Sequence, residues 1–397
     1  KLFKKFVFIS NRFTYFLSFL LKCEKFYNME KQKICIIGDG LSGLTSAIAL
    51  NNLKNVEIHL ISRKSKNIVD KRTTAISESN LNFLKANISN LNTKLFWPSK
   101  HIELFYETNS EKINFLNLKD EKNNLMYVCE NKKLKDILIK EIKKRKINII
   151  KKEIKDIDTI KKYELKILCL GSKSKLYNRI INMRSIDKDY KEIAITGHVT
   201  HKLKKIKTSQ TFLKEGPLAV LPFSKNKFSF VWSLDNSFFN TNNKKINTIL
   251  SEKIKKILDT KENFKINNLQ SYPIKLDLKR KYHYKNILIL GEGLHVIHPV
   301  AGQGFNLVIR DIKKLKEIVA YYTKLGISLA NSNALKDFNL KRKPENIILG
   351  LAVDVTHNFF KKNYLLDPLK SILLKNLNNN NTIKKISKII SNRGLSA

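Results

Sequence analysis

The stretch KQKICIIGDGLSGLTSAIALNNLKNVEIHLISRKS, residues 31–65, constrains the fold more than any other part of this sequence. Its apolar run at residues 33–37 predicts a short strand, residues 41–53 predict a helix, and residues 56–61 predict a second strand. The glycines at the strand-to-helix turn follow the pattern GxGxxG. This pattern, within a β-α-β unit, predicts a dinucleotide-binding turn.

Each glycine of this turn has a separate physical reason. Gly38 allows the tight turn, Gly40 lets the backbone approach a pyrophosphate, and Gly43 lets the helix pack on the strand. Leu41 and Ser42 begin the helix, whose N-terminus offers N–H groups and a positive dipole to a phosphate. We therefore expect these five residues to contact a cofactor.

The end of the second strand departs from the pattern. An Asp or Glu is expected there to hold a ribose hydroxyl, but the strand ends at Ser62. A neutral serine hydroxyl can still accept a hydrogen bond, although a weaker one than a carboxylate accepts. Ser62 is therefore kept as a candidate cofactor contact.

A second glycine-rich stretch, GEGLHVIHPVAGQGFNLVIRD at residues 291–311, contains four of the 13 glycines of the chain. The apolar residues 286–291 predict a strand, and a helix is expected to begin near Gly304. This stretch therefore presents a second helix N-terminus, where an electron-rich group is expected. Two such turns suit one long cofactor, with its pyrophosphate at one turn and a redox ring at the other.

The chain between the two turns has a different pattern. Residues 193–234 alternate between apolar and polar side chains, with a Gly-Pro break at 216–217, which predicts antiparallel strands. Residues 246–258 predict a helix, and the last third of the chain is expected to be helical. The nucleotide-binding unit is therefore expected in two segments, on either side of an inserted antiparallel sheet.

The composition favours some classes of partner over others. The 397-residue chain is 42% hydrophobic, which argues against wholesale disorder, and its formal net charge is +42. Lysines scattered along the chain supply most of this charge, which favours a surface for anionic lipid over a nucleic-acid site with clustered basic residues. The four cysteines form no CxxC pair and have no histidine at ligand spacing, so we expect reduced thiols and no metal site.

Several segments are similar to motifs of one known family. They are GDGLSG after the first strand, DKRTTAIS at 70–77, MYVCENKKLKDIL at 126–138, FLKEGPLAVLPF and FSFVWS within 212–233, and GEGLHVIHPVAGQGFNLVIRD at 291–311. On these motifs the chain, from residue 33 to its end, resembles the FAD-dependent aromatic-ring hydroxylases. The combination of GPLAVLP with HPVAGQGFN resembles most closely the branch that acts in ubiquinone biosynthesis.

The resemblance implies further cofactor contacts. Arg72 matches an arginine beside the flavin and the FAD phosphates, and Lys132 stands where the family usually has an arginine. Glu292 stands at the Asp of the family's GDAAH motif, which holds a ribityl or ribose-side hydroxyl. The turn whose backbone lies against the isoalloxazine ring would comprise Pro299, Gly302, Gln303, Gly304 and Asn306.

Three departures from the family bear on FAD affinity more than on the fold. They are Ser62, Glu292 in place of Asp, and CLGSKS at residues 169–174, where the superfamily has a GADG element followed by Ser. Glu292 keeps the acceptor of the family's Asp but lengthens the side chain by one methylene.

The implied chemistry belongs to the flavin. NAD(P)H would reduce FAD, the reduced flavin would add O2 to form a hydroperoxide, and its terminal oxygen would pass to a phenol ring. His298 is a candidate acid or base toward the phenol, although a structural role is the stronger interpretation for it and for His295. Apolar residues of the inserted sheet are candidates for the substrate pocket, and alternate residues of a strand are equally expected to be core. These candidates are Leu218, Val220, Pro222 and Phe230.

The expected fold is an α/β fold with a Rossmann-like FAD-binding domain that is discontinuous in sequence. Its two parts are expected at residues 29–185 and 276–330, with a β-rich substrate domain at 186–275 and a C-terminal helical region at 331–397. Residues 1–28 are interpreted as a non-native extension upstream of the natural start, because Met29 lies just before the first strand.

The expected function is ring hydroxylation of a polyprenylated phenol or quinol in ubiquinone biosynthesis, with FAD as cofactor and NAD(P)H and O2 as co-substrates. Because such a substrate lies in the bilayer, the basic C-terminal region predicts a cytoplasmic enzyme held peripherally on the inner face of the membrane or in a ubiquinone-biosynthesis complex. The alternatives are a hydroxylase of a soluble aromatic acid, a flavin reductase of prenyl chains, and a non-catalytic homologue that scaffolds the complex. The sequence leaves open the ring position, the choice between NADH and NADPH, and the oligomeric state.

Overall fold

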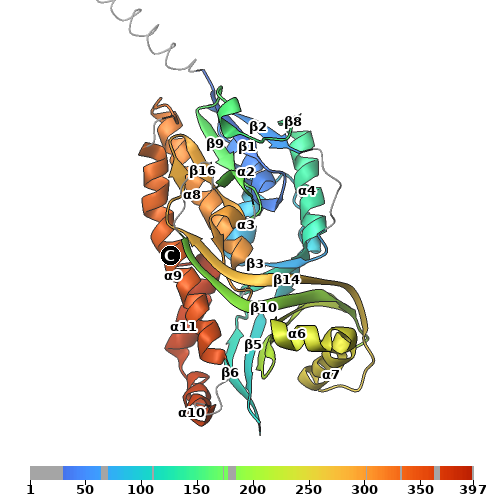
Figure 1. Ribbon diagram of the computed structural model, residues 1–397. Helices are drawn as coiled ribbons and strands as arrows, with labels where there is room; N and C mark the ends of the chain where they lie inside the picture. The colour runs from blue at the N-terminus through green and yellow to red at the C-terminus, as the bar shows by residue number, and fades with distance from the viewer. Residues whose placement is uncertain are drawn as a thin grey trace, which may run out of the picture.

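A six-stranded sheet, in the order β15-β16-β9-β1-β2-β8, forms one layer of the structure (Figure 1). The structure is a computed structural model that describes residues 30–395 apart from 64–69, 110, 173, 178–184, 301, 331–332 and 362–366. The expected extension at 1–28 therefore lies outside the described residues. Only β15 pairs antiparallel in this sheet. The strands are β1 (Gln32–Ile37), β2 (Val56–Ser62), β8 (Asn148–Lys151), β9 (Leu165–Leu168), β15 (His283–Tyr284) and β16 (Ile287–Ile289).

Helices pack on this sheet because their apolar side chains share one face. In α4 (Asn131–Lys144) the buried Leu134, Leu138 and Ile142 recur every four residues. In α2 (Leu41–Asn51) every residue from Gly43 to Leu50 is buried, so the helix is enclosed on all sides. Together with α8 (Gly304–Lys324), these helices enclose the largest hydrophobic core of the molecule.

An eight-stranded sheet forms the second layer, in the order β17-β14-β10-β13-β12-β11-β5-β6. Its longest strands, β10 (Ser185–Thr200) and β14 (Lys265–Lys279), cross the middle of the molecule side by side (Figure 1). Helices α6 (Asn236–Asn242) and α7 (Ile246–Leu258) lie beside this sheet. The other strands are β5 (His101–Glu107), β6 (Lys112–Lys119), β11 (Thr208–Leu213), β12 (Gly216–Ser224), β13 (Lys227–Asp235) and β17 (His295–Val296).

A three-stranded sheet and a C-terminal group of helices complete the fold. The small sheet consists of β3 (Thr73–Ser77), β7 (Met126–Glu130) and β4 (Trp97–Ser99), and α3 (Glu78–Asn87) follows β3. The C-terminal helices are α9 (Asn333–Phe360), α10 (Asp367–Leu377) and α11 (Asn381–Arg393), which lie along one flank (Figure 1). Among the described helices, none combines the length and the hydropathy that a membrane span requires.

The expected α/β fold class is confirmed, and so are most of the expected elements. The helix expected at residues 246–258 has those bounds, and the helix expected near Gly304 begins there. Residues 73–77, within the motif at 70–77, pair with β7 as strand β3. Strands β5 and β6 were not expected, and they join the second sheet although they precede residue 186. The domain bounds given above remain predictions.

The described cysteines behave as small apolar residues. Cys35, Cys129 and Cys169 are buried free thiols. Burial raises the pKa of each of them to about 12. These thiols are therefore protonated and unreactive at neutral pH.

Candidate functional site

The first glycine turn, between β1 and α2, contains two closed positions and one open position. A Cβ added at Gly38, whose φ is +119°, would lie 2.3 Å from the carbonyl oxygen of Cys169. A Cβ at Gly43 would lie 1.9 Å from the carbonyl oxygen of Gly38. At Gly40, by contrast, none of the described atoms lies within 4 Å of the added Cβ. The open glycine precedes the first residues of α2, Leu41 and Ser42, where a phosphate could approach.

The second glycine turn leads into α8 in a similar way. Gly302 has a φ of +61°, and around Gly304 the described atoms leave the added Cβ open space to 4 Å. Asn306, in the first turn of α8, donates to the carbonyl of Ala75 at 3.0 Å and accepts from the N–H of Ser77 at 2.9 Å. These bonds attach the start of α8 to β3. Pro299 and Gln303, the other residues expected at this turn, are half-buried.

The start of the second glycine-rich stretch lies against the first turn. The short 3-10 helix Gly291–Gly293 follows β16, and a Cβ at Gly291 would lie 2.7 Å from Oγ of Ser42. The carboxyl ends of the parallel strands β1 and β16 lie at the same edge of the six-stranded sheet, and α2 packs against α8. Parallel sheets bind ligands at the carboxyl ends of their strands, and both turns follow such ends.

Arg72 lies next to this region and is held in place by neighbouring side chains. Its Nε and Nη2 donate to the two carboxylate oxygens of Asp70 at 2.9 and 2.8 Å, and its guanidinium lies 5.0 Å from the ring centre of Tyr272. The hydrogen bond to Asp70 raises the pKa of Arg72, and the charge of Glu292 raises it further. Arg72 and Glu292, which are far apart in the sequence, are therefore close enough in the structure to interact electrostatically. Glu292 itself is exposed.

The other two residues expected to contact the cofactor are Ser62 and Lys132. Ser62 is buried, and its Oγ accepts a hydrogen bond from Nζ of Lys151 at 2.7 Å. Lys132 is exposed in the first turn of α4, whereas the preceding Asn131 is buried and donates to Asp70 at 2.9 Å. Sequence reasoning missed Lys151 and Asn131. Asn131 lies in the quoted ENK motif and could have been found there, while Lys151 has no local signal.

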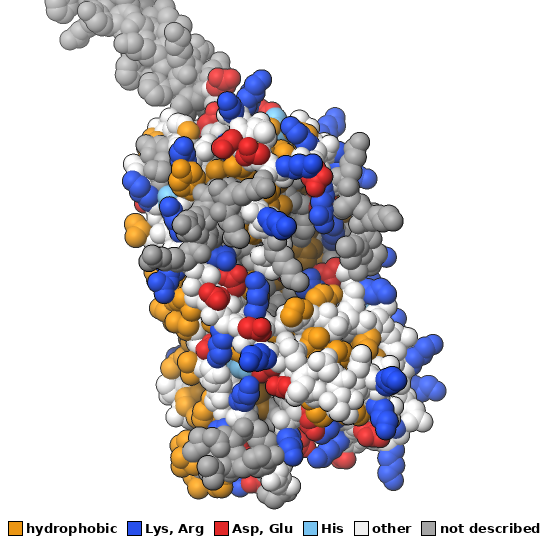
Figure 2. Space-filling view, in the orientation of Figure 1, with side chains coloured by type: hydrophobic (Ala, Val, Ile, Leu, Met, Phe, Trp, Pro, Cys, Tyr) orange, Lys and Arg blue, Asp and Glu red, His pale blue; other side chains and the backbone are white. Residues whose placement is uncertain are grey.

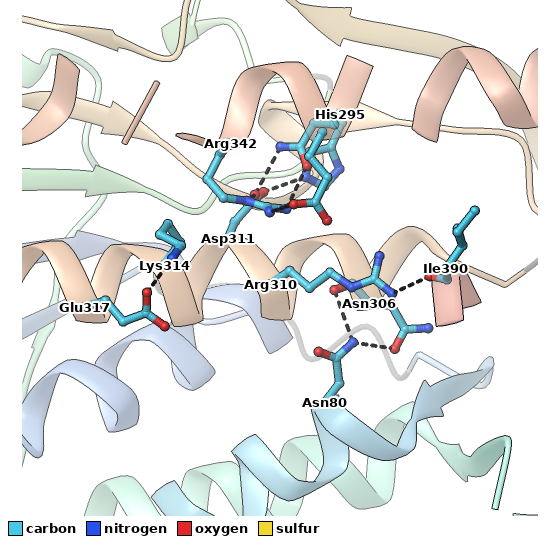
Figure 3. A network of polar contacts seen from close by, with 11 residues as sticks. Asn80, His295, Asn306, Arg310, Asp311, Lys314, Glu317, Arg342 and Ile390 are labelled. Carbon is cyan, nitrogen blue, oxygen red and sulfur yellow. Dashed lines mark hydrogen bonds and ion pairs between the residues drawn. The ribbon is translucent and has the colours of Figure 1, made fainter. Parts of the chain in front are cut away.

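The histidines of the second stretch are both buried. Nε2 of His295 lies 2.7 Å from Oδ2 of Asp311, and Oδ1 of Asp311 accepts from Nε of Arg342 at 2.6 Å (Figure 3). His298 is fully buried, its Nε2 lies 3.2 Å from Glu192, and its Nδ1 accepts from the N–H of Val300 at 3.2 Å. Burial lowers the pKa of His298. With both ring nitrogens engaged, His298 is suited to holding the turn and has no nitrogen left for a phenol.

The four expected substrate residues lie on one face of the second sheet. Leu218, Val220 and Phe230 belong to the hydrophobic core that also contains Leu250 of α7. Pro222 is buried too, and it lies on the same face because it follows Leu218 and Val220 at every second position of β12. The opposite face of the sheet is turned toward β3, the strand that directly follows Arg72, because Oγ of Ser229 on β13 lies 2.5 Å from Oγ1 of Thr73 on β3. The sheet residues closest to the cofactor side are therefore their neighbours one position along each strand, which include Leu221 and Val231.

Comparison with known families supports the cofactor assignment. A family model described as "FAD binding domain" matches residues 169–336. This range contains the second glycine turn and the sheet before it. FAD is thus confirmed as the cofactor, while the expected bounds of the FAD-binding domain stay predictions.

Curated relatives are similar over part of their length. "Ubiquinone biosynthesis monooxygenase COQ6, mitochondrial" of Dictyostelium discoideum is 27% identical over 210 residues, covering 45% of this chain and 42% of that protein. "3-demethoxyubiquinol 3-hydroxylase" of Escherichia coli is 27% identical over 165 residues, covering 41% of each. The matched regions therefore span less than half the length of these relatives.

Solved structures share the fold over most of the chain. The p-nitrophenol 4-monooxygenase PnpA of Pseudomonas putida has a TM-score of 0.73 at 13% identity, covering 92% of this chain and 100% of that one. PqsL of Pseudomonas aeruginosa, described as a probable FAD-dependent monooxygenase, has a TM-score of 0.67 at 13% identity, covering 87% and 100%. At these identities the likeness shows the fold alone.

Proposed function

We propose that this chain, a relative of the FAD-dependent hydroxylases of ubiquinone biosynthesis, is itself an FAD-dependent monooxygenase that hydroxylates the ring of a polyprenylated phenol or quinol. One observation carries the proposal. The two glycine-rich stretches, far apart in sequence, meet where Gly291 lies against Ser42, and each leaves an open glycine, Gly40 or Gly304, at the N-terminus of a helix. A long cofactor with a pyrophosphate and a redox ring fits this arrangement.

The residues present fit FAD. The open space at Gly40 admits a pyrophosphate to the N-terminus of α2, and Arg72 supplies a fixed positive charge nearby. When bound, FAD would accept hydride from NAD(P)H and would activate O2. The N-terminus of α8 behind Gly304 would stabilise negative charge on the reduced ring through its dipole.

The chain's own task is to orient the substrate ring and to keep water out. We place the substrate on the sheet face that carries Leu221 and Val231, both half-buried and apolar. The residues that the sequence analysis proposed for the substrate, such as Leu218 and Phe230, would instead pack between the other face of this sheet and α7. An apolar wall suits a prenylated ring better than an aromatic acid, whose carboxylate would need a charged partner.

The direct test uses purified protein and a short-chain prenylated phenol. We expect a yellow protein with a flavin spectrum, oxidation of NAD(P)H that increases when the phenol is added, and a product one oxygen atom heavier by mass spectrometry. A colourless protein that takes up no FAD on reconstitution would contradict the proposal. A quinone profile of cells lacking the protein would then identify the ring position through the intermediate that accumulates.

A non-catalytic homologue that scaffolds a biosynthetic complex is the second candidate. The observation that favours it is the Lys151–Ser62 hydrogen bond, since it occupies a hydroxyl that was expected to contact the ribose. Under this alternative the protein would bind no FAD, and its removal would lower the amounts of other pathway proteins. Normal levels of those proteins together with loss of one hydroxylation step would exclude it.

We also propose that the C-terminal helices hold the enzyme on the membrane surface. Exposed apolar side chains lie at helical spacing along one side of α9, namely Leu340, Ile348, Leu351, Val355 and Phe359. We call these five residues the α9 stripe. Figure 2 shows hydrophobic side chains along the flank where Figure 1 places the C-terminal helices.

Charge selects an anionic bilayer as the partner of the α9 stripe. The exposed Lys336 and Lys341 flank the stripe on the same helix, and the whole chain carries a net charge of +42. On α10, the exposed Leu369, Ile372 and Leu373 form a second apolar face. A helix with an apolar face and basic flanks binds in the plane of an anionic membrane.

A further inference from the structure

A buried carboxylate joins two histidines that lie 59 residues apart in the sequence, on different elements. Glu192 on β10 lies 3.2 Å from Nε2 of His298 through one oxygen and 3.1 Å from Nε2 of His357 on α9 through the other. All three residues are buried. The two imidazole rings stack with their centres 4.2 Å apart at an angle of 21°. We call these residues the Glu192 cluster.

The backbone fixes the protonation of one histidine in the cluster. Nδ1 of His298 accepts the N–H of Val300, so it cannot carry a proton. The proton of the neutral ring must then lie on Nε2, where it is donated to Glu192. Burial disfavours a second proton and lowers the pKa of His298. His298 is therefore held in a single tautomer and a single orientation.

The same bond makes the Glu192 cluster a poor metal site, although one carboxylate and two imidazoles are common ligands. A metal on Nε2 of His298 would require the proton on Nδ1, which faces an N–H. The ammonium group of Lys361 also lies 3.8 Å from Glu192 and would repel a cation. Hydrogen bonding accounts for the cluster without a metal.

The Glu192 cluster connects three parts of the fold at one point. Glu192 lies where the pairing of β10 with β14 is interrupted by a bulge, beside Lys191 with a φ of +54°. His298 directly precedes Pro299 and the second glycine turn. His357 lies on α9, the helix that carries the α9 stripe. A displacement of α9 would therefore remove one hydrogen bond from the carboxylate that orients His298.

We propose that Glu192 and His357 are positioning residues for the second glycine turn, so that the contact of His357 with Glu192, and not the docking of α9 in general, sets the affinity of that turn for FAD. This inference rests on the proposed FAD-dependent function. Glu192 orients His298, His298 orients the N–H of Val300, and the turn that follows presents Gly302 and Gly304 to the flavin. His357 makes the orientation of Glu192 depend on α9.

A matched pair of variants separates this role from simple packing. Glu192→Met removes the acceptor at similar size, so the Nε2–H of His298 is left without its bond. Asp354→Leu is the control, because Asp354 also joins α9 to β10, through Tyr190 at 2.7 Å and Lys188 at 2.9 Å, but does not touch His298. We expect Glu192→Met to raise the Kd for FAD by about tenfold and to change the visible spectrum of the bound flavin. Asp354→Leu should lower Tm while leaving both unchanged.

Conservative variants supply the rescue. His357→Gln keeps an N–H donor for Glu192 and should bind FAD as the native protein does, whereas His357→Phe should weaken FAD binding several-fold, because Glu192 then keeps only one of its two histidine partners. His357→Phe also keeps the test available if Glu192→Met does not fold. Kd values are measured by quenching of flavin fluorescence on the full chain.

Three results would overturn the proposal. The first is an equal rise in Kd for Asp354→Leu and Glu192→Met, since α9 docking would then act without the cluster. The second is native FAD affinity in His357→Phe. The third is stoichiometric zinc or iron in the purified native protein, lost in Glu192→Met. Absence of FAD binding by the native protein would instead contradict the proposed function, so the two failures are distinguishable.

Discussion

At the scale of single residues, identical residue types meet different demands within one turn. Gly43 is enclosed by backbone, whereas Gly40 faces open space among the described atoms. The GxGxxG spacing predicted both roles, because the pattern itself encodes them. Glu192 could not be predicted in the same way, since its partners His298 and His357 lie more than 100 residues away in the sequence and leave no local pattern.

The two glycines should therefore respond differently to substitution by alanine. Gly43→Ala would bring a Cβ within 1.9 Å of a backbone oxygen, and we expect it to lower the free energy of unfolding by about 2 kcal/mol or more. Gly40→Ala should leave stability nearly unchanged and weaken FAD binding, because the Cβ occupies the approach to the phosphates. Urea denaturation and flavin titration measure the two effects. Equal loss of stability in both variants would contradict this assignment.

The buried network between α8 and α9 supports a second prediction at this scale. Arg342 is buried against Asp311 and Glu345 (Figure 3). Arg342→Met would leave Asp311 without its main counter-charge, and we expect a loss of about 3–5 kcal/mol in the free energy of unfolding. The control is Lys314→Met, which breaks the partly exposed pair with Glu317 and should cost less than about 1 kcal/mol. A small effect of Arg342→Met in urea denaturation would show that the network carries little stability.

At the scale of elements, the sequence predicted which strands exist better than which face they present. The alternation along β12 was clear, but nothing in it says which of the two faces meets the cofactor side. That choice depends on α7, which covers Leu218 and Val220, and on the Thr73–Ser229 contact from another sheet. A shift of one residue exchanges the two faces completely.

This choice of face is testable with two leucines of β12. Leu218→Ala removes a fully buried side chain and should cost about 2–5 kcal/mol of stability, with little change in KM for the phenol substrate. Leu221→Ala should do the reverse, raising KM several-fold, by the order expected for a lost apolar contact, at a smaller cost in stability. Thermal unfolding and steady-state kinetics distinguish the two. A KM effect confined to Leu218→Ala would restore the original assignment.

The α9 stripe gives a second prediction for an element. Replacing Leu340, Ile348 and Val355 together by Gln removes apolar surface but no buried contact, so Tm should change little. We expect the variant to lose most of its co-sedimentation with vesicles that contain anionic lipid. Tyr321→Gln, an exposed aromatic on α8, is the control and should sediment as the native protein does. Native binding by the triple variant would remove the stripe as the membrane contact.

At the scale of the whole molecule, buried histidines make stability depend on pH. Burial lowers the pKa of His198, His201, His283 and His298 below the usual value. The unfolded chain therefore binds more protons below about pH 6.5 than the folded one does. The stability from these groups is fully present above that pH and is lost as the pH falls.

We accordingly expect the midpoint of urea unfolding to be highest at neutral pH and to fall steadily between about pH 6.5 and 5. Below this range the loss should continue, because hydrogen bonds from the two histidines overcome burial and lower the pKa of Glu192 to about 2. His283→Gln, outside the Glu192 cluster, should reduce the slope of this dependence. A midpoint that rises on acidification would contradict the assignment.

How much of the architecture could be predicted also depends on sequence separation. The β-α-β unit and the division of the nucleotide-binding unit followed from local patterns. The pairing of β5 with β11 could not be predicted in this way, since the two strands are separated by far more residues than any local pattern spans. The sequence of β5 alone does not indicate which of the sheets it joins. The same holds for the bulged pairing of β10 with β14.

The strand order of the six-stranded sheet has a consequence for the newly made chain. β9 lies between β1 and β16, yet β16 leaves the ribosome only after seven of the eight strands of the second sheet have been synthesised. Until then one edge of β9 has unpaired backbone groups, which can pair with other chains. Closing so long a loop is entropically slow. The nascent protein therefore depends on a strand from its last third to cover the edge of β9 in its middle third, and FAD can act as a folding ligand only once that closure is complete.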